Sequence, residues 1–408
     1  MKFDFKSVDP ASRDTKILVE NWNSWQWQLR HSATDLGSFS KSLTLTPDEA
    51  AAFNDGKDLF SVRCTPYYLS LLGPSPQDPL RKVLVPQIRE IVAGHQALLD
   101  PLGERKNNPV PRIIHRYSDR ALFLITDFCS VYCRYCTRKH FTGQGQSLIP
   151  AEDYAKALSY LRERKGIREV ILSGGDPLTL SDEVLARVLS DLRDIEHLEI
   201  IRIGTRMPVV CPMRITENLV RILKLANPLY MMVHFNHPRE LTAEAAGALT
   251  LLADSGIPLF NQMVLLNGVN NHPAIVQALS RRLLYLRVKP YYMFQCDPSI
   301  GTDHLRTSIG ESMKIQRELW GHLSGLAMPT LSVDIPEGGG KAALVPQFET
   351  ATESLQTSEG AVFQKRFYQG FDGVQAEYID PDPALRETPL DAELYFAEWE
   401  ELKNAKLR

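Results

Sequence analysis

Short apolar, β-branched runs alternate along the chain with segments of helical periodicity, in which apolar residues recur three and four positions apart. The runs lie at residues 121–126, 169–173, 198–203, 229–235, 258–266 and 288–294, and the helical segments between them include 152–164, 182–192, 216–225 and 242–255. This order predicts an α/β fold with a parallel sheet and helices outside, which right-handed crossovers curl into a full or partial (β/α)6 barrel.

The pattern before this region is helical. The run Leu18–Arg30 has its apolar residues, among them Trp22 and Trp25, at the spacing of one helix face, so we expect a helix with buried tryptophans. Thr46 followed by proline is typical of a helix start. We therefore predict a mostly helical N-terminal region over residues 1–115.

The pattern after the barrel is mixed. Two stretches at residues 363–371 and 374–379 are typical of a β-hairpin, and Asp391–Leu402 is typical of an acidic helix. We expect three parts in all: the N-terminal region, a barrel over residues 116–343, and a small C-terminal extension over residues 344–408.

Composition excludes several classes of protein. The 408 residues are 44% hydrophobic and 23% charged, which is ordinary for globular proteins and argues against a disordered or fibrous chain. A net charge of −3 gives no reason to expect a nucleic-acid or membrane partner. No apolar run approaches the ~18–20 residues of a transmembrane helix, and the start lacks the apolar stretch of a secretion signal. Six cysteines are too few for a disulfide scaffold, so we expect the reducing cytoplasm.

Three cysteines stand close together directly after the first apolar run. Cys129, Cys133 and Cys136 have C-x3-C-x2-C spacing. Three thiols can hold three corners of a [4Fe–4S] cluster, which leaves the fourth iron open to another ligand. Structural zinc is the alternative, but it requires four ligands. The remaining cysteines are scattered and are expected to be small buried hydrophobic residues: Cys64, Cys211 and Cys296.

The cysteine motif at the end of the first strand resembles that of the radical S-adenosylmethionine (SAM) enzymes, and six further motifs narrow the resemblance. They are CTRKHF (136–141), LSGGDPL (172–178), RIGTRMPVV (202–210), HFNHP (234–238), PYYMFQCD (290–297) and VDIPEGGGK (333–341). In this order they are similar to the lysine 2,3-aminomutase family, from about Trp22 to Lys341. The resemblance implies a radical SAM partial barrel and three cofactors: a [4Fe–4S] cluster, SAM and pyridoxal 5′-phosphate (PLP).

The resemblance also implies a SAM site at the ends of the second, fourth and fifth strands. Paired glycines in a turn let backbone N–H groups approach a ligand, and Asp176 could take the amine of SAM. His234 and Gln262 are expected to hold the rest of SAM. A plain turn and structural hydrogen bonds are the alternatives. The turn that matches the family consists of Ser173, Gly174, Gly175 and Asp176.

Lys341 follows three glycines, in a loop that could move as the lysine changes partner, and it matches the family's lysine that forms a Schiff base with PLP. An amine nucleophile is what an aldehyde cofactor requires, although a solvated loop tip is the alternative. Arg116, Tyr117 and Arg120, ahead of the first strand, match the residues that hold the anionic groups of PLP. One position departs from the family: Tyr135 replaces a histidine that contacts the phosphate, and its hydroxyl could take over that contact.

Arg138 matches the arginine that binds the α-carboxylate of the substrate, which a guanidinium group holds through two parallel hydrogen bonds. Asp297 and Asp334 end neighbouring late strands and match the two acids that bind the distal amine of lysine. Two carboxylates suit a cationic side chain and would reject glutamate. Relatives that act on glutamate lack this pair, as does the short relative that prepares β-lysine for elongation factor P. Strand capping or pairing with surface arginines is the alternative for both acids.

A second departure concerns the C-terminus. The clostridial-type enzyme holds zinc with C-terminal cysteines and one cysteine of a neighbouring subunit. This chain has no cysteine after Cys296, and His272 stands where the partner cysteine would be expected. We therefore expect no structural zinc, although N-terminal helices exchanged between subunits could still form a homo-oligomer, a dimer or tetramer.

Together these matches predict an isomerase, a radical SAM and PLP-dependent 2,3-aminomutase that moves the α-amino group of a basic L-amino acid to carbon 3. L-Lysine is the leading substrate and L-arginine the runner-up, because a guanidinium group would also pair with both acids; ornithine is possible but shorter. An electron donor such as flavodoxin or ferredoxin is implied. Two other classes remain: a radical SAM enzyme without PLP that performs different hydrogen abstraction, and a non-enzymatic iron–sulfur or zinc protein.

Overall fold

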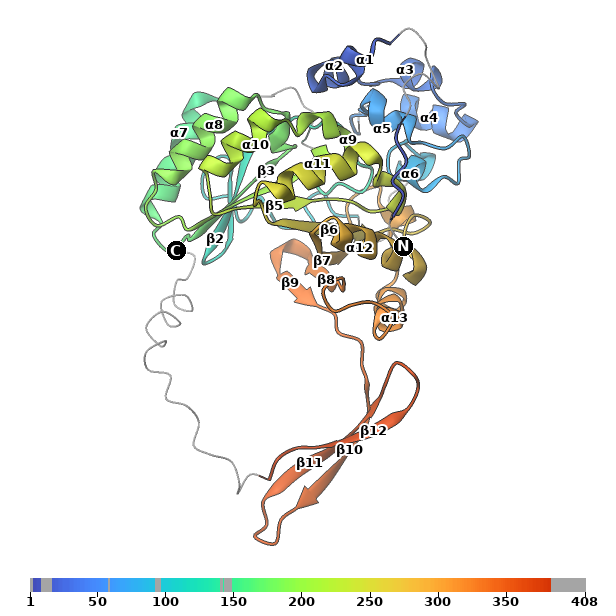
Figure 1. The fold of residues 1–408 in the computed structure, drawn as a ribbon, viewed down its shortest axis with the longest axis vertical. Helices are drawn as coiled ribbons and strands as arrows, with labels where there is room; N and C mark the ends of the chain where they lie inside the picture. Colours follow the sequence, from blue (N-terminus) through green and yellow to red (C-terminus); the bar gives the residue numbers. More distant parts are fainter. Residues whose placement is uncertain are drawn as a thin grey trace.

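The protein is described here by a computed structural model, which covers residues 3–8, 17–57, 59–91, 97–139, 142 and 149–382. Its body is a nine-stranded sheet in which the strands lie side by side in chain order, from β1 to β9. Figure 1 shows helices along the outside of this sheet and a separate three-stranded sheet that extends away from the body. The predicted partial barrel is confirmed.

The strands from β2 to β8 are parallel, and one antiparallel strand borders them on each side. The six apolar runs of the sequence coincide with β2 to β7. The bounds are β1 Ile113–Tyr117, β2 Arg120–Thr126, β3 Glu169–Gly174, β4 Ile200–Thr205, β5 Leu229–Val233, β6 Leu259–Leu265, β7 Val288–Gln295, β8 Thr330–Ile335 and β9 Gly340–Ala343.

Helices connect the parallel strands, and several begin at a side-chain cap. Ser181, Thr216, Thr242 and Ser308 each accept a hydrogen bond from a backbone N–H three residues later, which satisfies one free donor at the helix start. Buried side chains of these helices and of the sheet form one large apolar core. The helices are α7 Ala151–Glu163, α8 Asp182–Arg193, α9 Met207–Val210, α10 Glu217–Leu225, α11 Ala243–Asp254, α12 Pro273–Tyr285 and α13 Ile309–Leu319.

The N-terminal region contains helices, as predicted, but they are short. The expected helix over Leu18–Arg30 is wrong as a single element, because the chain breaks at Asn23 and Ser24 caps a new helix through the N–H of Trp27. Trp22 is buried as expected, whereas Leu18 is exposed. The helices are α1 Val19–Trp22, α2 Trp25–Arg30, α3 Leu36–Ser40, α4 Pro47–Asp55, α5 Pro66–Ser70 and α6 Pro79–Lys82.

The predicted start of α4 is confirmed, since the Thr46 hydroxyl accepts the N–H of Glu49 and the Glu49 carboxylate accepts the N–H of Thr46. The boundary expected at residue 115 falls inside β1, a strand that the sequence pattern did not predict. No described helix is long and apolar enough to cross a membrane.

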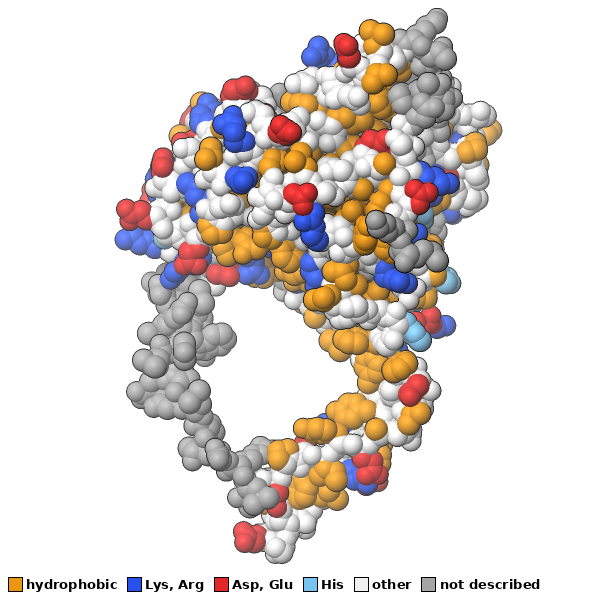
Figure 2. Space-filling model, in the orientation of Figure 1, with side chains coloured by type: hydrophobic (Ala, Val, Ile, Leu, Met, Phe, Trp, Pro, Cys, Tyr) orange, Lys and Arg blue, Asp and Glu red, His pale blue; other side chains and the backbone are white. Residues whose placement is uncertain are grey.

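The C-terminal extension forms an antiparallel sheet of β10 Glu349–Gln356, β11 Val362–Gln369 and β12 Gln375–Ile379. The predicted hairpin is its β11–β12 pair. Figure 2 shows apolar side chains on this sheet. Val362 of β11 and Tyr378 of β12 are exposed. The helix expected over Asp391–Leu402 lies outside the described residues.

Candidate active site at the carboxyl ends of the strands

The loop with the three cysteines follows β2 and is tied to the N-terminal region by its backbone. The N–H of Tyr132 donates to the carbonyl of Arg63 at 3.1 Å, and the N–H of Arg134 donates to the carbonyl of Val83 at 2.9 Å. The Arg134 side chain is fully buried and donates to both carboxylate oxygens of Glu90, at 2.7–3.0 Å. This buried ion pair fixes the middle of the loop.

Two of the thiols receive hydrogen bonds from nitrogen donors. Arg206 Nη1 lies 2.8 Å from Cys133 Sγ, and the backbone N–H of Arg138 donates to Cys136 Sγ at 3.3 Å. Donors of this kind stabilise thiolate ligands and tune iron–sulfur clusters. Among the described residues, no group of three or more His, Cys, Asp or Glu is arranged to hold a single metal ion. The donor set of three thiols with N–H partners fits an iron–sulfur cluster.

Two of the buried thiols, those of Cys129 and Cys136, hold their protons near pH 7. Burial raises the pKa of Cys129 well above its usual range, and the neighbouring thiols and Asp176 add to the effect. Burial likewise raises the pKa of Cys136. Binding of a cluster would therefore release these protons and supply the positive charge that the buried thiolates require.

Arg206 is a site residue that our sequence analysis missed. It follows β4 directly, and its Nη2 donates to Glu240 Oε1 at 2.6 Å and lies 3.0 Å from the hydroxyl of Tyr68. Its Nε is buried and has no hydrogen-bond partner among the residues described. Its position in the RIGTRMPVV motif, at the carboxyl end of a strand, was a signal that could have identified it.

The turn predicted to contact SAM ends β3, as expected. A Cβ atom at Gly174 or Gly175 would lie 2.1 or 2.2 Å from the carbonyl oxygen of Thr126 or Phe128, so both glycines let the turn pack against the chain that leads into the cysteine loop. Asp176 accepts hydrogen bonds from the N–H groups of Leu178 and Arg206, and from the Thr205 hydroxyl. Its carboxylate thus joins the ends of β3 and β4, and its contact with SAM stays a prediction.

His234 follows β5, and its buried Nε2 has no hydrogen-bond partner in the part of the chain that the structure describes. Burial and the charge of Arg206 lower its pKa to about 3, so the ring is neutral at pH 7. An unpartnered buried nitrogen of this kind fits a bound polar ligand such as SAM. Gln262 lies in the middle of β6 rather than at its end, and its side chain has no hydrogen-bond partner among the described residues.

Lys341 is held beside Asp334 by strand pairing. The two residues are direct partners of β9 and β8, and Lys341 Nζ donates to both oxygens of Asp334 at 3.1 and 3.3 Å. The backbone N–H of Lys341 donates to the Tyr117 hydroxyl at 3.1 Å. Our expectation of a mobile glycine loop is therefore corrected: the glycines precede Lys341, and the lysine itself lies in a paired strand.

The residues predicted to hold PLP surround this lysine. Arg116 Nη1 is 3.6 Å from Asp334, and its Nε and Nη1 are buried without hydrogen-bond partners among the described residues. The Arg120 guanidinium lies 3.9 Å above the ring of Tyr117. A buried guanidinium with unpaired donors fits an anionic group such as the phosphate of PLP.

Tyr135 is not part of this group. Its hydroxyl accepts a hydrogen bond from Asn236 Nδ2 at 2.7 Å, and its ring stacks on His234 with 5.6 Å between the ring centroids. The side chain is buried on the side of the residues predicted to bind SAM. The contact with the phosphate that we expected therefore finds no support in the structure.

The residues predicted to bind the substrate come from two parts of the chain: Arg138 follows the cysteine loop, whereas Asp297 follows β7 and Asp334 lies in β8. Arg138 is held by Glu104, which the sequence analysis did not identify, and its Nη1 donates to the hydroxyl of Ser173 at 3.0 Å. Asp297 lies two residues past β7, the neighbour of β8. Burial and the charge of Asp334 raise the pKa of Asp297 to about 7. The charge of Asp334 thus reaches Asp297, and the contact of both acids with a substrate stays a prediction.

Comparison with protein families matches two parts of the chain. Residues 123–277 match the radical SAM superfamily, and residues 316–406 match the family described as lysine-2,3-aminomutase. The first match covers the cysteine loop and β3 to β6, and the second covers the strand that carries Lys341.

Curated relatives match most of the chain. The L-lysine 2,3-aminomutase of Clostridium subterminale is 43% identical over 362 residues, which are 88% of this chain and 85% of the relative. The L-lysine 2,3-aminomutase of Fusobacterium nucleatum is 41% identical, over 93% of this chain and 87% of the relative. The glutamate 2,3-aminomutase of Clostridioides difficile is also 41% identical, over 88% of this chain and 87% of the relative.

Proposed function

The chain belongs to the lysine 2,3-aminomutase family of radical SAM enzymes, and we propose that it converts L-lysine into β-lysine by moving the α-amino group to carbon 3. Relatives that act on lysine and on glutamate match this chain at similar identity, so overall similarity does not choose the substrate. We therefore infer the substrate from the residues that are expected to contact the end of the substrate's side chain.

The observation that carries the proposal is the pair Asp297 and Asp334. Burial raises the pKa of Asp297, and the two acids lie close enough for the charge of Asp334 to raise it further. A cationic side chain between them would relieve this repulsion, whereas a third carboxylate would increase it. The pair therefore favours lysine over glutamate. L-Arginine, whose guanidinium group would meet the same acids, is the second candidate.

The residues of the chain have separate tasks in this proposal. When bound at the cysteine loop, the reduced cluster and SAM supply a radical that removes a hydrogen atom from carbon 3. When bound at Lys341, PLP supplies an aldehyde that takes up the amine and a π-system that stabilises the radical. Arg116 and its neighbours Tyr117 and Arg120 would hold the phosphate, and Arg138 would hold the α-carboxylate, which together orient carbon 3.

Lys341 and Asp334 exchange partners in this scheme. In the structure the ammonium group of Lys341 neutralises Asp334. The distal ammonium group of lysine can replace it, so that Asp334 keeps a cationic partner and its burial remains compensated. Lys341 is about one-third exposed and is free to leave, since its side chain forms no ion pair with another described acid.

Product analysis tests the proposal. The reconstituted enzyme is incubated without oxygen with SAM, PLP and dithionite, and L-lysine, L-arginine and L-glutamate are offered separately. β-Lysine as the main product is the expected result. β-Arginine would move the assignment to the second candidate, and β-glutamate would overturn the argument from the two acids.

Other expectations stay predictions. These are a low-potential electron donor such as flavodoxin or ferredoxin, assembly as a dimer or tetramer, and a cytoplasmic location. His272, expected where relatives place a cysteine, caps α12 through Nδ1, which accepts the N–H of Ala274 at 3.2 Å.

A further inference from the structure

A short segment of the N-terminal region, Leu98–Asn107, crosses the candidate site, and we call it the strap. It begins beside the loop that carries Asp297. The N–H of Leu98 donates to the carbonyl of Pro298 at 2.8 Å, and the carbonyl of Leu98 accepts the N–H of Ile300 at 3.2 Å. This parallel bridge fixes one end of the strap directly after the predicted ammonium site.

The middle of the strap packs closely against the turn that precedes Lys341. The carbonyl of Pro101 accepts the N–H of Glu337 at 2.8 Å. Gly103 has φ of 61°, and a Cβ atom there would lie only 2.7 Å from the carbonyl of Glu337 and 2.8 Å from the nitrogen of Gly338. Glycine is thus required for this close contact, both by its backbone conformation and by the space available.

The strap reaches Arg138 through Glu104, whose side chain is almost fully buried. Its two oxygens accept hydrogen bonds from Arg138 Nε at 2.9 and 3.1 Å, and Oε1 also accepts one from Arg138 Nη2 at 2.5 Å. Glu104 therefore occupies the Nε–Nη2 edge of the guanidinium group. Nη1 donates to the Ser173 hydroxyl at 3.0 Å and to the Gly174 carbonyl at 3.4 Å. Of the five N–H donors of the guanidinium group, one on Nη2 is therefore left for a second carboxylate among the described contacts.

The strap also has internal and terminal anchors that keep Glu104 in place. The carboxylate of Asp100 accepts the N–H of Glu104 at 2.8 Å and that of Arg105 at 2.9 Å. At the far end, the carbonyl of Asn107 accepts the N–H of His115 at 2.8 Å, next to Arg116. The ten residues of the strap therefore contact segments next to four predicted sites: those for the substrate ammonium group, the substrate carboxylate, the PLP attachment at Lys341 and the PLP phosphate.

We propose that the strap positions the substrate, and that Glu104 is the positioning residue which fixes the edge of Arg138 so that the remaining N–H of Nη2 receives the α-carboxylate. The proposal rests on the proposed function, because Arg138 is assigned to the substrate there. Glu104 does not touch the substrate in this account. It acts by pre-orienting the guanidinium group, so that substrate binding does not have to immobilise it.

The alternative for Glu104 is competition, in which its carboxylate must leave Arg138 before the substrate carboxylate can bind. The two accounts predict opposite effects of Glu104→Gln. The uncharged amide of glutamine replaces one acceptor oxygen with an NH2 donor, so loss of the charge-assisted pair weakens pre-orientation and raises KM for lysine about 10- to 100-fold. In the competition account, removal of the competing charge lowers KM.

The test is steady-state kinetics of Glu104→Gln with lysine, together with a crystal structure of the variant. We expect the rise in KM, a change in kcat of less than about threefold, and an Arg138 side chain that no longer reaches Ser173. Asp100→Ala, which loosens the strap without touching Arg138, should raise KM in the same direction. Unchanged or lower KM in Glu104→Gln, with Arg138 still on Ser173, would overturn the proposal.

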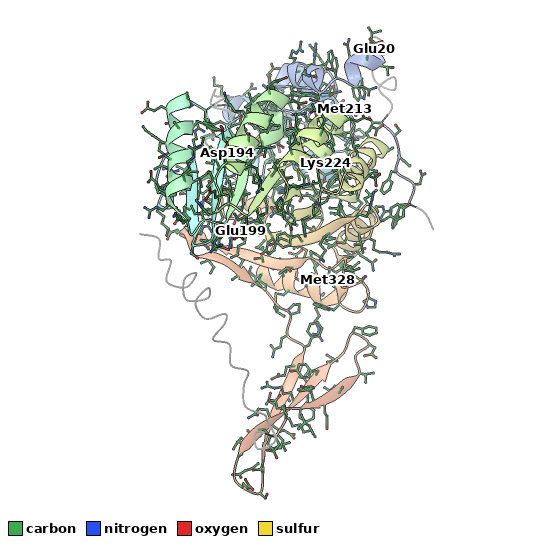
Figure 3. The ribbon with its side chains drawn as sticks, turned by 60° about the vertical axis from the view of Figure 1, so that its left-hand side comes forward. Glu20, Asp194, Glu199, Met213, Lys224 and Met328 are labelled. Atoms are coloured by element: carbon green, nitrogen blue, oxygen red, sulfur yellow. The ribbon has the colours of Figure 1, made fainter. Side chains whose placement is uncertain are left out.

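Glu199→Gln is the matched control, because Glu199 also pairs with an arginine, Arg168, but lies exposed directly before β4. Figure 3 labels it on the body of the protein. It should leave KM and kcat unchanged. Failure of the proposed function is distinguishable, because wild-type enzyme would then not convert lysine. The position of Arg138 in the variant crystal would still decide whether Glu104 orients it.

Discussion

Replacement of Glu240 by alanine removes the acid that holds Arg206 beside the cysteine loop. Glu240 is fully buried, and its Oε1 accepts hydrogen bonds from Arg206 Nη2 and the Tyr68 hydroxyl, both at 2.6 Å. Its Oε2 accepts the N–H groups of Asn236 and His237 at 2.6 and 3.0 Å. The substitution therefore leaves a buried guanidinium group and three further donors without their acceptor.

The expected loss is large. At 2.6 Å the two charges attract by about 6 kcal/mol if the effective dielectric constant is ~20, before the cost of burial is subtracted. Removal of one partner from a buried pair costs about 3–5 kcal/mol, because the remaining charge is buried and unpaired. We expect Glu240→Ala to lower the free energy of unfolding by that amount. Asp254→Ala, which breaks the exposed pair with Arg287, should cost less than about 1 kcal/mol.

A double-mutant cycle measures the interaction itself. Urea denaturation is followed by circular dichroism for Glu240→Ala, Arg206→Met and the double variant. We expect the double variant to be more stable than the sum of the single losses predicts, by about 2–3 kcal/mol, since it buries no unpaired charge. If the losses simply add to within about 0.5 kcal/mol, the two side chains do not stabilise each other and our description of this pair is wrong.

Two further outcomes are expected. Because the pKa of Asp297 is about 7, its carboxyl group is protonated in the free enzyme at lower pH, so kcat/KM for lysine should rise as pH increases through about 7. The variant Asp297→Asn should lack this rise. A wild-type profile of kcat/KM that is flat between pH 6 and 8 would contradict the assignment of Asp297. Lys341→Ala should lose the absorbance band of bound PLP but still form 5′-deoxyadenosine from SAM, and a retained band would place the PLP attachment elsewhere.

The sequence predicts much of the barrel because its signals are local. Each apolar run is long enough to indicate a buried strand, and the spacing of Cys129, Cys133 and Cys136 places three thiols in one loop whatever the rest of the chain does. The order of strands and helices then determines the edge of the sheet at which the motifs meet. These inferences need no knowledge of distant contacts.

The missed features depend on contacts between distant residues. Glu104 and Arg138 are 34 positions apart in the sequence, and Glu240 and Arg206 are also 34 positions apart. No local pattern therefore predicts either ion pair. The three glycines before Lys341 indicated a flexible loop, but the pairing of β9 with β8 draws the lysine into a strand. Leu18–Arg30 had helical spacing, yet the side-chain cap at Ser24 starts a new helix.

We propose that this chain removes a hydrogen atom from carbon 3 of lysine and moves the amino group to that carbon. The most direct measurement uses L-lysine deuterated at carbon 3, with mass spectrometry of both β-lysine and 5′-deoxyadenosine after anaerobic turnover. We predict β-lysine as the product and deuterium in 5′-deoxyadenosine. Deuterium-free 5′-deoxyadenosine, or its formation without any β-amino acid, would contradict the claim.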